Sequence, residues 1–372
     1  MRNPLEIFIQ KEHLIHKKLR SNLKIHWTYV RFFYFNHLFN QRFESQKSKK
    51  FVRSFKYLKT ILGSLFRLKK NKEIFLIASS KEAQSVIKHF KLHKRIDSKE
   101  SLDLSVLTYN TASPGFVYVD LIKIIARLGG NFVALRSSKP NKRIVAKLFI
   151  ESIWMTRLFK VLFKLIRPQK IFIINWYTFY PAVVAAQQLK IEVHEVQHGI
   201  IHKEHPGYNM SSKIEVKHLP NTFHLWDEKF SKHIRIPAHL RFEYFGFPMQ
   251  LSEQLTPQKG KSILIISQAS ISTEISNHIN KLESFFSQYQ EVIFRIHPKE
   301  INNPNLKIPK RFTISTPEDE MFDEVLNRVS DVIGVFSTGL LKAEQLKKRI
   351  YLMDIPEKRK IESLLSSKYS IV

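Results

Sequence analysis

Apolar residues recur along the chain in two different patterns. Short runs at 73–80, 170–176 and 191–196 are predicted to be strands. The run at 170–176 is nearly all apolar, as is typical of a strand that is covered on both faces of a sheet. Apolar residues over 143–167 instead recur at helical spacing, and a second helix is predicted to begin near Pro181. This alternation of strands and helices predicts a parallel sheet with right-handed crossovers.

The second half of the chain repeats this plan. Strands are predicted over 262–268, 291–298, 311–316, 331–337 and 350–354, and helices over 272–289, 320–328 and 340–348. We therefore expect an α/β protein with two Rossmann-like domains, the first at 71–210 and the second at 211–372. The less regular stretch from 208 to 258 is expected to hold the link between them.

The first 70 residues have a different character. Basic and aromatic residues alternate over 26–39, and apolar residues recur at helical spacing from Phe55 to Leu65. The segment 1–70 is therefore predicted to be a basic helical extension that binds an anionic membrane surface or an acidic partner. A helix that packs one apolar face on its own domain gives the same pattern, so both interpretations stay open.

Charge and composition narrow the possible partners. The chain carries 61 Lys and Arg against 32 Asp and Glu, a formal net charge of +29, and such a field attracts nucleic acid, anionic lipid or phosphorylated substrates. The absence of cysteine excludes a disulfide framework, a thiolate zinc site and a cysteine nucleophile. We expect neither a signal peptide nor a transmembrane helix, because charges interrupt every apolar stretch. A cytoplasmic protein, peripheral on the inner face of the cell membrane, is the expected setting.

Four short motifs come directly after predicted strands. They are "QHG" at 197–199, "SQAS" at 267–270, "RIHPKE" at 295–300 and "FSTG" at 336–339. Ligands of open parallel sheets bind beyond the carboxyl ends of the strands, so these motifs are the first candidates for a site. The stretch 195–209 also contains three histidines, which a simple turn does not need.

Together these motifs carry a resemblance. The sequences "QHGIIHKEHPGY", "SQAS", "RIHPKE" and "DVIGVFSTGLLKAEQLKKRIYLMD" resemble those of GT-B glycosyltransferases from bacterial capsule and lipopolysaccharide clusters. They are also similar to the capsule-biosynthesis and polyol-phosphate transferase groups. The resemblance covers roughly 170–354. It implies a GT-B-like fold whose two domains face a cleft, with a nucleotide-sugar donor in the C-terminal domain and a lipid-linked glycan acceptor approaching from the N-terminal domain.

The donor site is expected to be formed by basic side chains and a helix start. Arg295, His297 and Lys299 supply donors and positive charge for phosphate, although a satisfied turn histidine between solvated basic residues is the alternative. Ser337 and Thr338 lie where a strand turns into a helix and can hold phosphate oxygens, or can simply cap the helix. The remaining donor-site candidates are Ser267 and Gln268 after their strand and, by the resemblance, Glu344 on the ribose hydroxyls.

The acceptor side is expected to contain the general base. The resemblance assigns this role to His198, whose ordinary pKa of about 6.5 suits a neutral imidazole, with Gly199 allowing a sharp turn beside it. Gln197, His205 and Tyr208 are the expected acceptor-binding residues. A zinc site on the three histidines is the competing idea, but the glycines and proline of this stretch argue against the single helix face that such a site would need.

No metal or cofactor is expected. The chain has no Asp-X-Asp pair, no Gly-X-Gly-X-X-Gly and no Gly-Lys-Ser/Thr loop, so basic groups and helix N-termini are expected to neutralise the leaving phosphate. The expected function is metal-independent transfer of a sugar from a nucleotide donor to a surface polysaccharide. The alternatives are a polyol-phosphate or CMP-sialic acid/Kdo-type transferase, a more distant sugar-nucleotide 2-epimerase, and a basic nucleic-acid binder, for which no recognisable binding signature is present.

Overall fold

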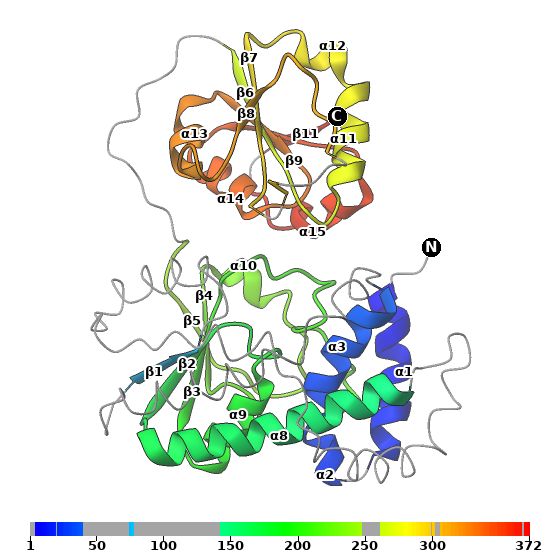
Figure 1. The fold of residues 1–372 in the computed structure, drawn as a ribbon, viewed down its shortest axis with the longest axis vertical. Helices are drawn as coiled ribbons and strands as arrows, with labels where there is room; N and C mark the ends of the chain where they lie inside the picture. Colours follow the sequence, from blue (N-terminus) through cyan, green and yellow to red (C-terminus); the bar gives the residue numbers. More distant parts are fainter. Residues whose placement is uncertain are drawn as a thin grey trace. The chain divides into compact units, whose positions relative to one another are not determined.

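The computed structural model describes residues 4–19, 21–39, 74–77, 142–247, 261–298, 300–301, 306–366 and 368–372. The chain divides into two compact units, Met1–Pro248 and Met249–Val372, which we call unit 1 and unit 2. Each unit is built on a parallel β-sheet of its own (Figure 1). The predicted α/β class with two parallel sheets is confirmed.

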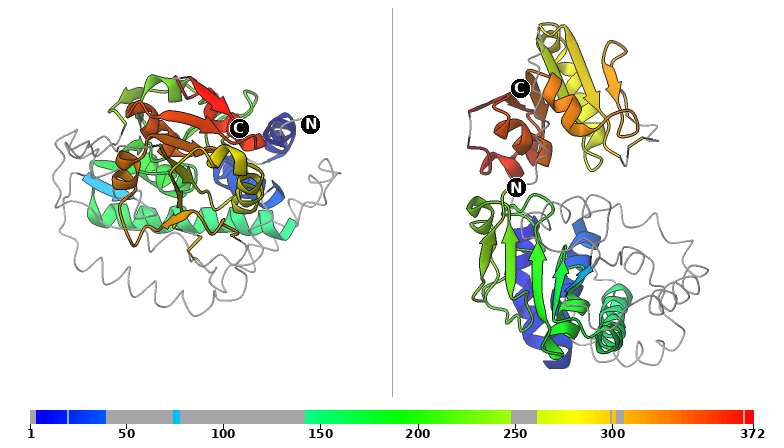
Figure 2. Two further views of the ribbon diagram at one scale, coloured as in Figure 1. Left: turned by 90° about the horizontal axis from the view of Figure 1, so that it is seen from above. Right: turned by 90° about the vertical axis from the view of Figure 1, so that its left-hand side faces the viewer.

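Unit 1 contains a five-stranded sheet in the order β1-β2-β3-β4-β5, and Figure 2 shows the common direction of its strands from the side. The strands are β1 (Ile74–Ile77), β2 (Lys170–Ile173), β3 (Glu192–Val196), β4 (Thr222–Leu225) and β5 (Phe242–Tyr244). The domain boundary predicted at 210 is wrong, because β4 pairs with β3 and β5 pairs with β4, so the first unit continues to Pro248. The division between Pro248 and Met249 does lie within 208–258, the stretch that was expected to hold the link.

The helices of unit 1 include three that come before the first strand. They are α1 (Pro4–Lys18), α2 (Ser21–Lys24), α3 (Trp27–Phe39), α8 (Lys142–Ile166), α9 (Tyr180–Gln188) and α10 (Glu228–Ser231). The long helix predicted over 143–167 is present as α8, which packs against both α9 and α3. Pro181 lies in the first turn of α9, as predicted.

The N-terminal helices are part of the core of unit 1. Trp27, Val30 and Tyr34 of α3 are buried, and the Trp27 ring stacks on Phe149 of α8 with ring centroids 6.5 Å apart. Four aromatic residues of this stretch therefore pack inside the unit, in accord with the packed-helix alternative: Trp27, Tyr29, Tyr34 and Phe35. The helix predicted from Phe55 to Leu65 lies outside the described residues.

Unit 2 contains a six-stranded parallel sheet in the order β11-β10-β9-β6-β7-β8. Its strands are β6 (Ser262–Ile266), β7 (Glu291–Arg295), β8 (Thr313–Ser315), β9 (Asp331–Gly334), β10 (Arg349–Leu352) and β11 (Tyr369–Ile371). The chain adds β7 and β8 on one side of β6 and then returns to place β9 on the other side. The direction of winding therefore switches between β6 and β9.

Helices cover both faces of the unit 2 sheet. They are α11 (Ser272–Lys281), α12 (Glu283–Phe286), α13 (Phe322–Arg328), α14 (Thr338–Gln345), the 3-10 helix η4 (Pro356–Lys358) and α15 (Arg359–Glu362). Figure 1 shows α11 on one side of the sheet and α14 on the other. The single helix predicted over 272–289 is two helices, because Leu282 between them has a non-helical ψ of 27°. No helix in the described part of the chain combines the length and apolar character needed to cross a membrane.

Candidate functional site

Two of the predicted motifs lie side by side at the switch point of unit 2. The "SQAS" turn follows β6, and the "FSTG" turn follows β9, its neighbour in the sheet. The Gln268 side chain joins them, since its Nε2 donates to the Phe336 carbonyl oxygen at 2.5 Å. The crevice at a switch point is where open α/β sheets bind ligands, so these turns occupy the position that the sequence led us to expect.

Helix α14 begins at this switch point. Ser337 is its N-cap, and the Ser337 Oγ accepts from the Gly339 N–H at 3.2 Å; Thr338 is the first helical residue. The predicted capping role of Ser337 is thus present, and it leaves the helix start able to attract an anion. The Lys360 Nζ lies 4.5 Å from the centroid of the Phe336 ring and adds positive charge nearby.

Gly339 sets the position of this helix against the sheet. A Cβ atom at residue 339 would lie 2.6 Å from Phe322 and 2.8 Å from Ile266, both closer than real Cβ contacts allow. Only glycine permits α14 to approach β6 so closely. The packing requirement therefore explains the glycine in "FSTG" without any ligand.

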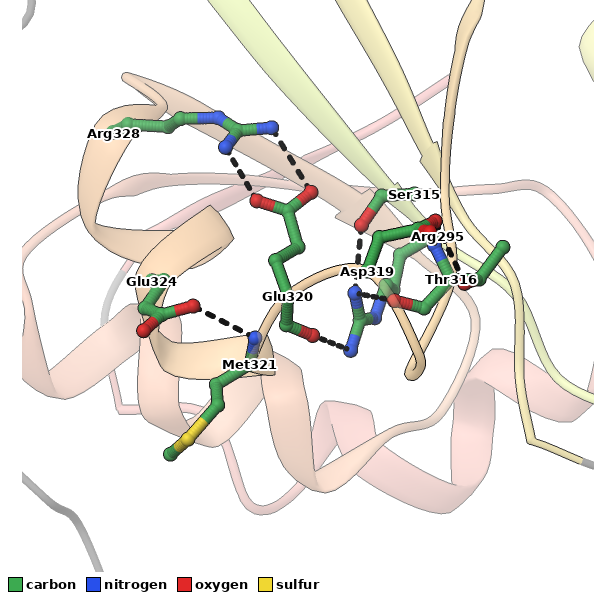
Figure 3. A network of polar contacts seen from close by, with 8 residues as sticks. All are labelled: Arg295, Ser315, Thr316, Asp319, Glu320, Met321, Glu324 and Arg328. Atoms are coloured by element: carbon green, nitrogen blue, oxygen red, sulfur yellow. Dashed lines mark hydrogen bonds and ion pairs between the residues drawn. The ribbon is translucent and has the colours of Figure 1, made fainter.

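Arg295, at the end of β7, is committed largely to the turn that follows β8 (Figure 3). Its NH1 donates to the Ser315 Oγ and the Thr316 carbonyl, both at 2.7 Å, and its NH2 donates to the Glu320 carbonyl at 2.9 Å. Burial lowers the pKa of Arg295 from its ordinary value. A phosphate-binding role for Arg295 would have to use its remaining N–H groups.

The rest of "RIHPKE" is organised by a residue that sequence reasoning missed. The Glu300 side chain is buried, and its Oε2 accepts from the Ser267 hydroxyl at 2.7 Å and from the His297 N–H at 3.1 Å. Its Oε1 is buried and has no hydrogen-bond partner among the described residues. Lys299 lies outside the described residues. An acidic residue inside an otherwise basic strand-end motif was the signal for Glu300.

Glu344 has a partner within unit 2. It lies on α14 and is half-buried, and its Oε1 accepts from the Ser366 N–H at 2.5 Å. The ribose contact that the resemblance implies for Glu344 stays a prediction.

In unit 1, the Gln197 side chain links the end of β3 to the end of β4 by hydrogen bonds. Its Oε1 accepts from the Trp226 N–H and its Nε2 donates to the Gly199 carbonyl, both at 2.9 Å. The chain bends at Gly199, but the bend does not require glycine, because Gly199 has no positive φ and a Cβ atom there would meet nothing within 4 Å. The sterically required glycine of this region is Gly207, where a Cβ would lie 2.2 Å from the Tyr177 ring.

His198 follows directly in this turn. Its side chain is half-exposed, but the Nδ1 is buried and has no hydrogen-bond partner in the described part of the chain. Burial lowers the pKa of His198 to about 4. The imidazole is therefore neutral at pH 7, as the proposed base requires, but it is less basic than the ordinary value implied.

The other two histidines of the stretch help to form the turn itself. The His202 Nδ1 accepts from the Glu204 N–H at 3.2 Å, and the His205 Nδ1 accepts from the Gly207 N–H at 3.1 Å. The His205 Nε2 lies 3.4 Å from the Tyr177 hydroxyl. Within the described ranges, no three His, Asp or Glu side chains converge to hold a metal ion. Local hydrogen bonding thus accounts for two of the three histidines.

A buried carboxyl group lies behind this turn. Glu195 of β3 is almost fully buried, and its Oε1 accepts from the Tyr208 hydroxyl at 2.6 Å and from the Trp176 N–H at 3.4 Å. Burial raises the pKa of Glu195 to about 8. Sequence reasoning missed Glu195, although an acidic residue inside a buried strand is itself a signal. Tyr208, predicted as acceptor-binding, is buried as the partner of this carboxyl group.

Comparison with known proteins shows no family for this chain. No family model matches the chain, and no curated protein matches it either. Similar solved structures include the glycotransferase of kitacinnamycin, with 9% identity, 80% of this chain and 84% of that chain covered, and a TM-score of 0.47. They also include the spinosyn rhamnosyltransferase SpnG, with 10% identity, 76% and 80% coverage, and a TM-score of 0.45.

A third similar structure is the UDP-GlcNAc 2-epimerase of Methanocaldococcus jannaschii in complex with UDP-GlcNAc and UDP. It has 12% identity, 80% of this chain and 88% of that chain covered, and a TM-score of 0.46. At these identities the likeness concerns the arrangement of strands and helices and nothing finer. Two of these similar structures are glycosyltransferases and one is a sugar-nucleotide epimerase.

Proposed function

We propose that this protein is a glycosyltransferase that binds a nucleotide-activated sugar in unit 2 and transfers the sugar to a surface-polysaccharide acceptor. The observation that supports this most is the pair of turns joined by Gln268 at the switch point between β6 and β9. A nucleotide bound there would meet hydroxyl groups, helix N–H groups and a cation within one crevice.

In this proposal the donor phosphates lie at the start of α14. The N–H groups of the first helical turn and the Ser337 and Thr338 hydroxyls would hold phosphate oxygens, with Lys360 near Phe336. His297 would approach from the end of β7, the strand next to β6. These groups favour negative charge, which grows on the nucleotide as the sugar leaves. A transferase of this kind needs no divalent metal for the leaving group.

The acceptor would meet unit 1. We assign the removal of the acceptor proton to His198, which is neutral at pH 7 because burial lowers its pKa to about 4. Gln197 would hold the turn that carries His198, and His205 would orient the acceptor. The net charge of +29 supports a lipid-linked acceptor at an anionic inner-membrane surface.

The first experiment is a thermal-shift screen of the full-length protein with UDP, GDP, CDP, CMP and their sugar derivatives. A ligand at 100 times its Kd raises the stability of the native state by about 2.7 kcal/mol, so the correct nucleotide should produce a clear shift. Ser337→Ala should reduce that ligand-induced shift. Asp227→Ala, which removes the N-cap of α10 in unit 1, is the matched control and should leave it unchanged.

Product analysis with the nucleotide that binds then separates the related reactions. Release of a nucleoside diphosphate supports sugar transfer, whereas release of CMP supports transfer of a polyol phosphate or an acidic sugar. Conversion to an isomeric nucleotide sugar without an acceptor supports 2-epimerisation. No shift with any nucleotide, together with salt-sensitive binding to RNA, would favour the nucleic-acid alternative.

A further inference from the structure

Two charged residues from different helices are completely buried in unit 1. The Arg31 Nε of α3 donates to the Glu12 Oε2 of α1 at 2.6 Å, and both side chains have 0% exposure. A buried ion pair repays the loss of hydration only when its remaining donors and acceptors are also satisfied. The groups that bond to these remaining donors and acceptors therefore show which part of the fold the ion pair holds in place.

Those partners are backbone groups of a single distant turn, residues 205–211, which we call the clamped turn. The Arg31 NH2 donates to the Asn209 carbonyl at 2.8 Å, and the Arg31 NH1 donates to the Pro206 carbonyl. The Glu12 Oε1 accepts from the Ser211 N–H. The pair thus binds the clamped turn at three positions.

The clamped turn is also anchored by its own side chains. Tyr208 donates its hydroxyl proton to the buried Glu195, and Gly207 packs directly against the ring of Tyr177. The turn is therefore held at its backbone by the N-terminal helices and on its other side by Tyr177, which follows β2, and by Glu195 of β3. His205 begins the clamped turn, and its ring centroid lies 5.2 Å from that of Tyr177 and 4.9 Å from that of Tyr208.

We propose that Glu12 and Arg31 are positioning residues that fix His205 on the acceptor side of the reaction. The assignment of the clamped turn to the acceptor side rests on the proposed function. Arginine is required because its planar fork reaches Glu12 and two carbonyl groups at once, whereas a lysine ammonium is a compact charge that cannot span them. Helices α1 and α3 are thus part of the acceptor site, because they carry Glu12 and Arg31.

A purely structural pair would behave differently. If Glu12 and Arg31 only stabilised unit 1 as a whole, weakening them would raise local opening throughout the unit. A positioning pair has its effect concentrated in the clamped turn. Hydrogen exchange resolves the two cases because it reports opening segment by segment.

The test compares full-length wild type with Arg31→Lys and Glu12→Gln by hydrogen–deuterium exchange. In both variants, exchange at 205–211 should be at least about tenfold faster, because a charge-assisted buried hydrogen bond is lost or weakened. Exchange in β2, β3 and α9 should change by less than about twofold. Arg349→Lys, which alters the Arg349–Asp331 pair of unit 2, is the control and should leave the clamped turn unchanged.

The second measurement is kinetic. With the nucleotide sugar found in the thermal-shift screen, Arg31→Lys should raise the acceptor KM or lower kcat while the donor KM stays constant. Unchanged exchange at 205–211, or an equal rise across unit 1, would overturn the proposal, and so would an altered donor KM. If no nucleotide binds, the proposed function fails, but the exchange result still decides whether the pair fixes the turn. If Arg31→Lys does not fold, Glu12→Gln gives the same comparison with a nearly isosteric side chain.

Discussion

At the scale of single residues, burial moves two neighbouring groups in opposite directions. Glu195 and His198 are three positions apart, and burial raises the pKa of Glu195 to about 8 and lowers the pKa of His198 to about 4. Burial disfavours the charged form of each group. Both side chains are therefore mainly neutral at pH 7, and each leaves a distinct pH dependence.

Glu195→Gln should weaken the pH dependence of the free energy of unfolding between about pH 5 and pH 9. The pKa of Glu195 is raised from 4.5 to about 8 in the folded state, so the protonated carboxyl contributes stability that is complete below about pH 4.5 and is lost as the pH rises to about 8. Urea unfolding from about pH 5 to pH 9 should show wild type losing stability relative to the variant. Glu192→Gln on the same strand is the control, since the pKa of Glu192 is lowered. Parallel curves for wild type and Glu195→Gln would contradict the expected protonation.

His198→Ala should reduce turnover by about 100- to 10,000-fold while donor affinity stays the same, because general-base catalysis contributes this much. The acid limb of kcat/KM in wild type should lie near pH 4, the lowered pKa of His198, and not near 6.5. Steady-state kinetics against pH check both points, with the exposed His239→Ala as control. Near-normal turnover in His198→Ala would move the base to another residue.

The role of a single residue can be predicted from the sequence only where its hydrogen-bond partner lies a few positions away. A capping Ser337 can be recognised because its partner, the Gly339 N–H, is two residues away. The role of Arg31 cannot be recognised in this way, because its carbonyl partners are 175 and 178 positions further along the chain. An arginine within an aromatic run marks a buried partner, but it does not identify that partner.

At the scale of elements, a strand can be recognised in the sequence when it is buried and long enough to form an apolar run. The runs that became β2, β6 and β9 are almost completely buried, and such strands stand out as largely apolar sequence. Three strands were missed: β4, β5 and β11. β5 and β11 are three residues long and partly exposed, so their residues show neither a long run nor a clear alternation. β4 is buried, but it has only four residues and His224 interrupts its apolar run. The switch point of unit 2 could be predicted from the sequence because its motifs follow well-buried strands.

Gly339→Ala should destabilise unit 2 and weaken nucleotide binding together. The added methyl group would lie 2.6 Å from Phe322 and 2.8 Å from Ile266, so α14 must shift away from β6. Overpacking of this kind typically costs about 1–3 kcal/mol. Gly199→Ala is a matched control, because a Cβ atom there meets nothing within 4 Å. Urea unfolding and nucleotide titration measure the two effects, and an undisturbed α14 would leave both at wild-type values.

At the scale of the whole molecule, the N-terminal helices and unit 1 depend on each other. A chain that begins near residue 72 lacks Trp27, which packs on Phe149, and lacks both members of the buried pair. Such a truncation therefore tests the folding of unit 1 before it tests any surface property. Membrane attachment is better tested on the full chain, which should bind anionic vesicles and detach as the salt concentration rises.

Deletion of residues 1–40 should accordingly destroy the cooperative unfolding of unit 1. It removes the apolar side chains of α1 and α3 from the core and leaves the Pro206 and Asn209 carbonyls without Arg31. Limited proteolysis should then cleave unit 1 before unit 2. Wild-type resistance of unit 1 in the shortened chain would show that the helices are dispensable for its folding.

The distance along the chain between the buried pair and its turn also constrains the order of folding. The Glu12 side chain accepts a hydrogen bond from the Ser211 N–H, which is 199 positions further along the chain. Helices α1 and α3 therefore cannot reach their final contacts until that part of the chain has left the ribosome. Until then, Arg31 and Glu12 can satisfy only each other or water. Contacts of such long sequence separation form slowly, because closure of the intervening chain costs entropy before the contact stabilises anything. A newly made chain therefore carries exposed aromatic helices for much of its synthesis, and this is the period in which it most needs a chaperone.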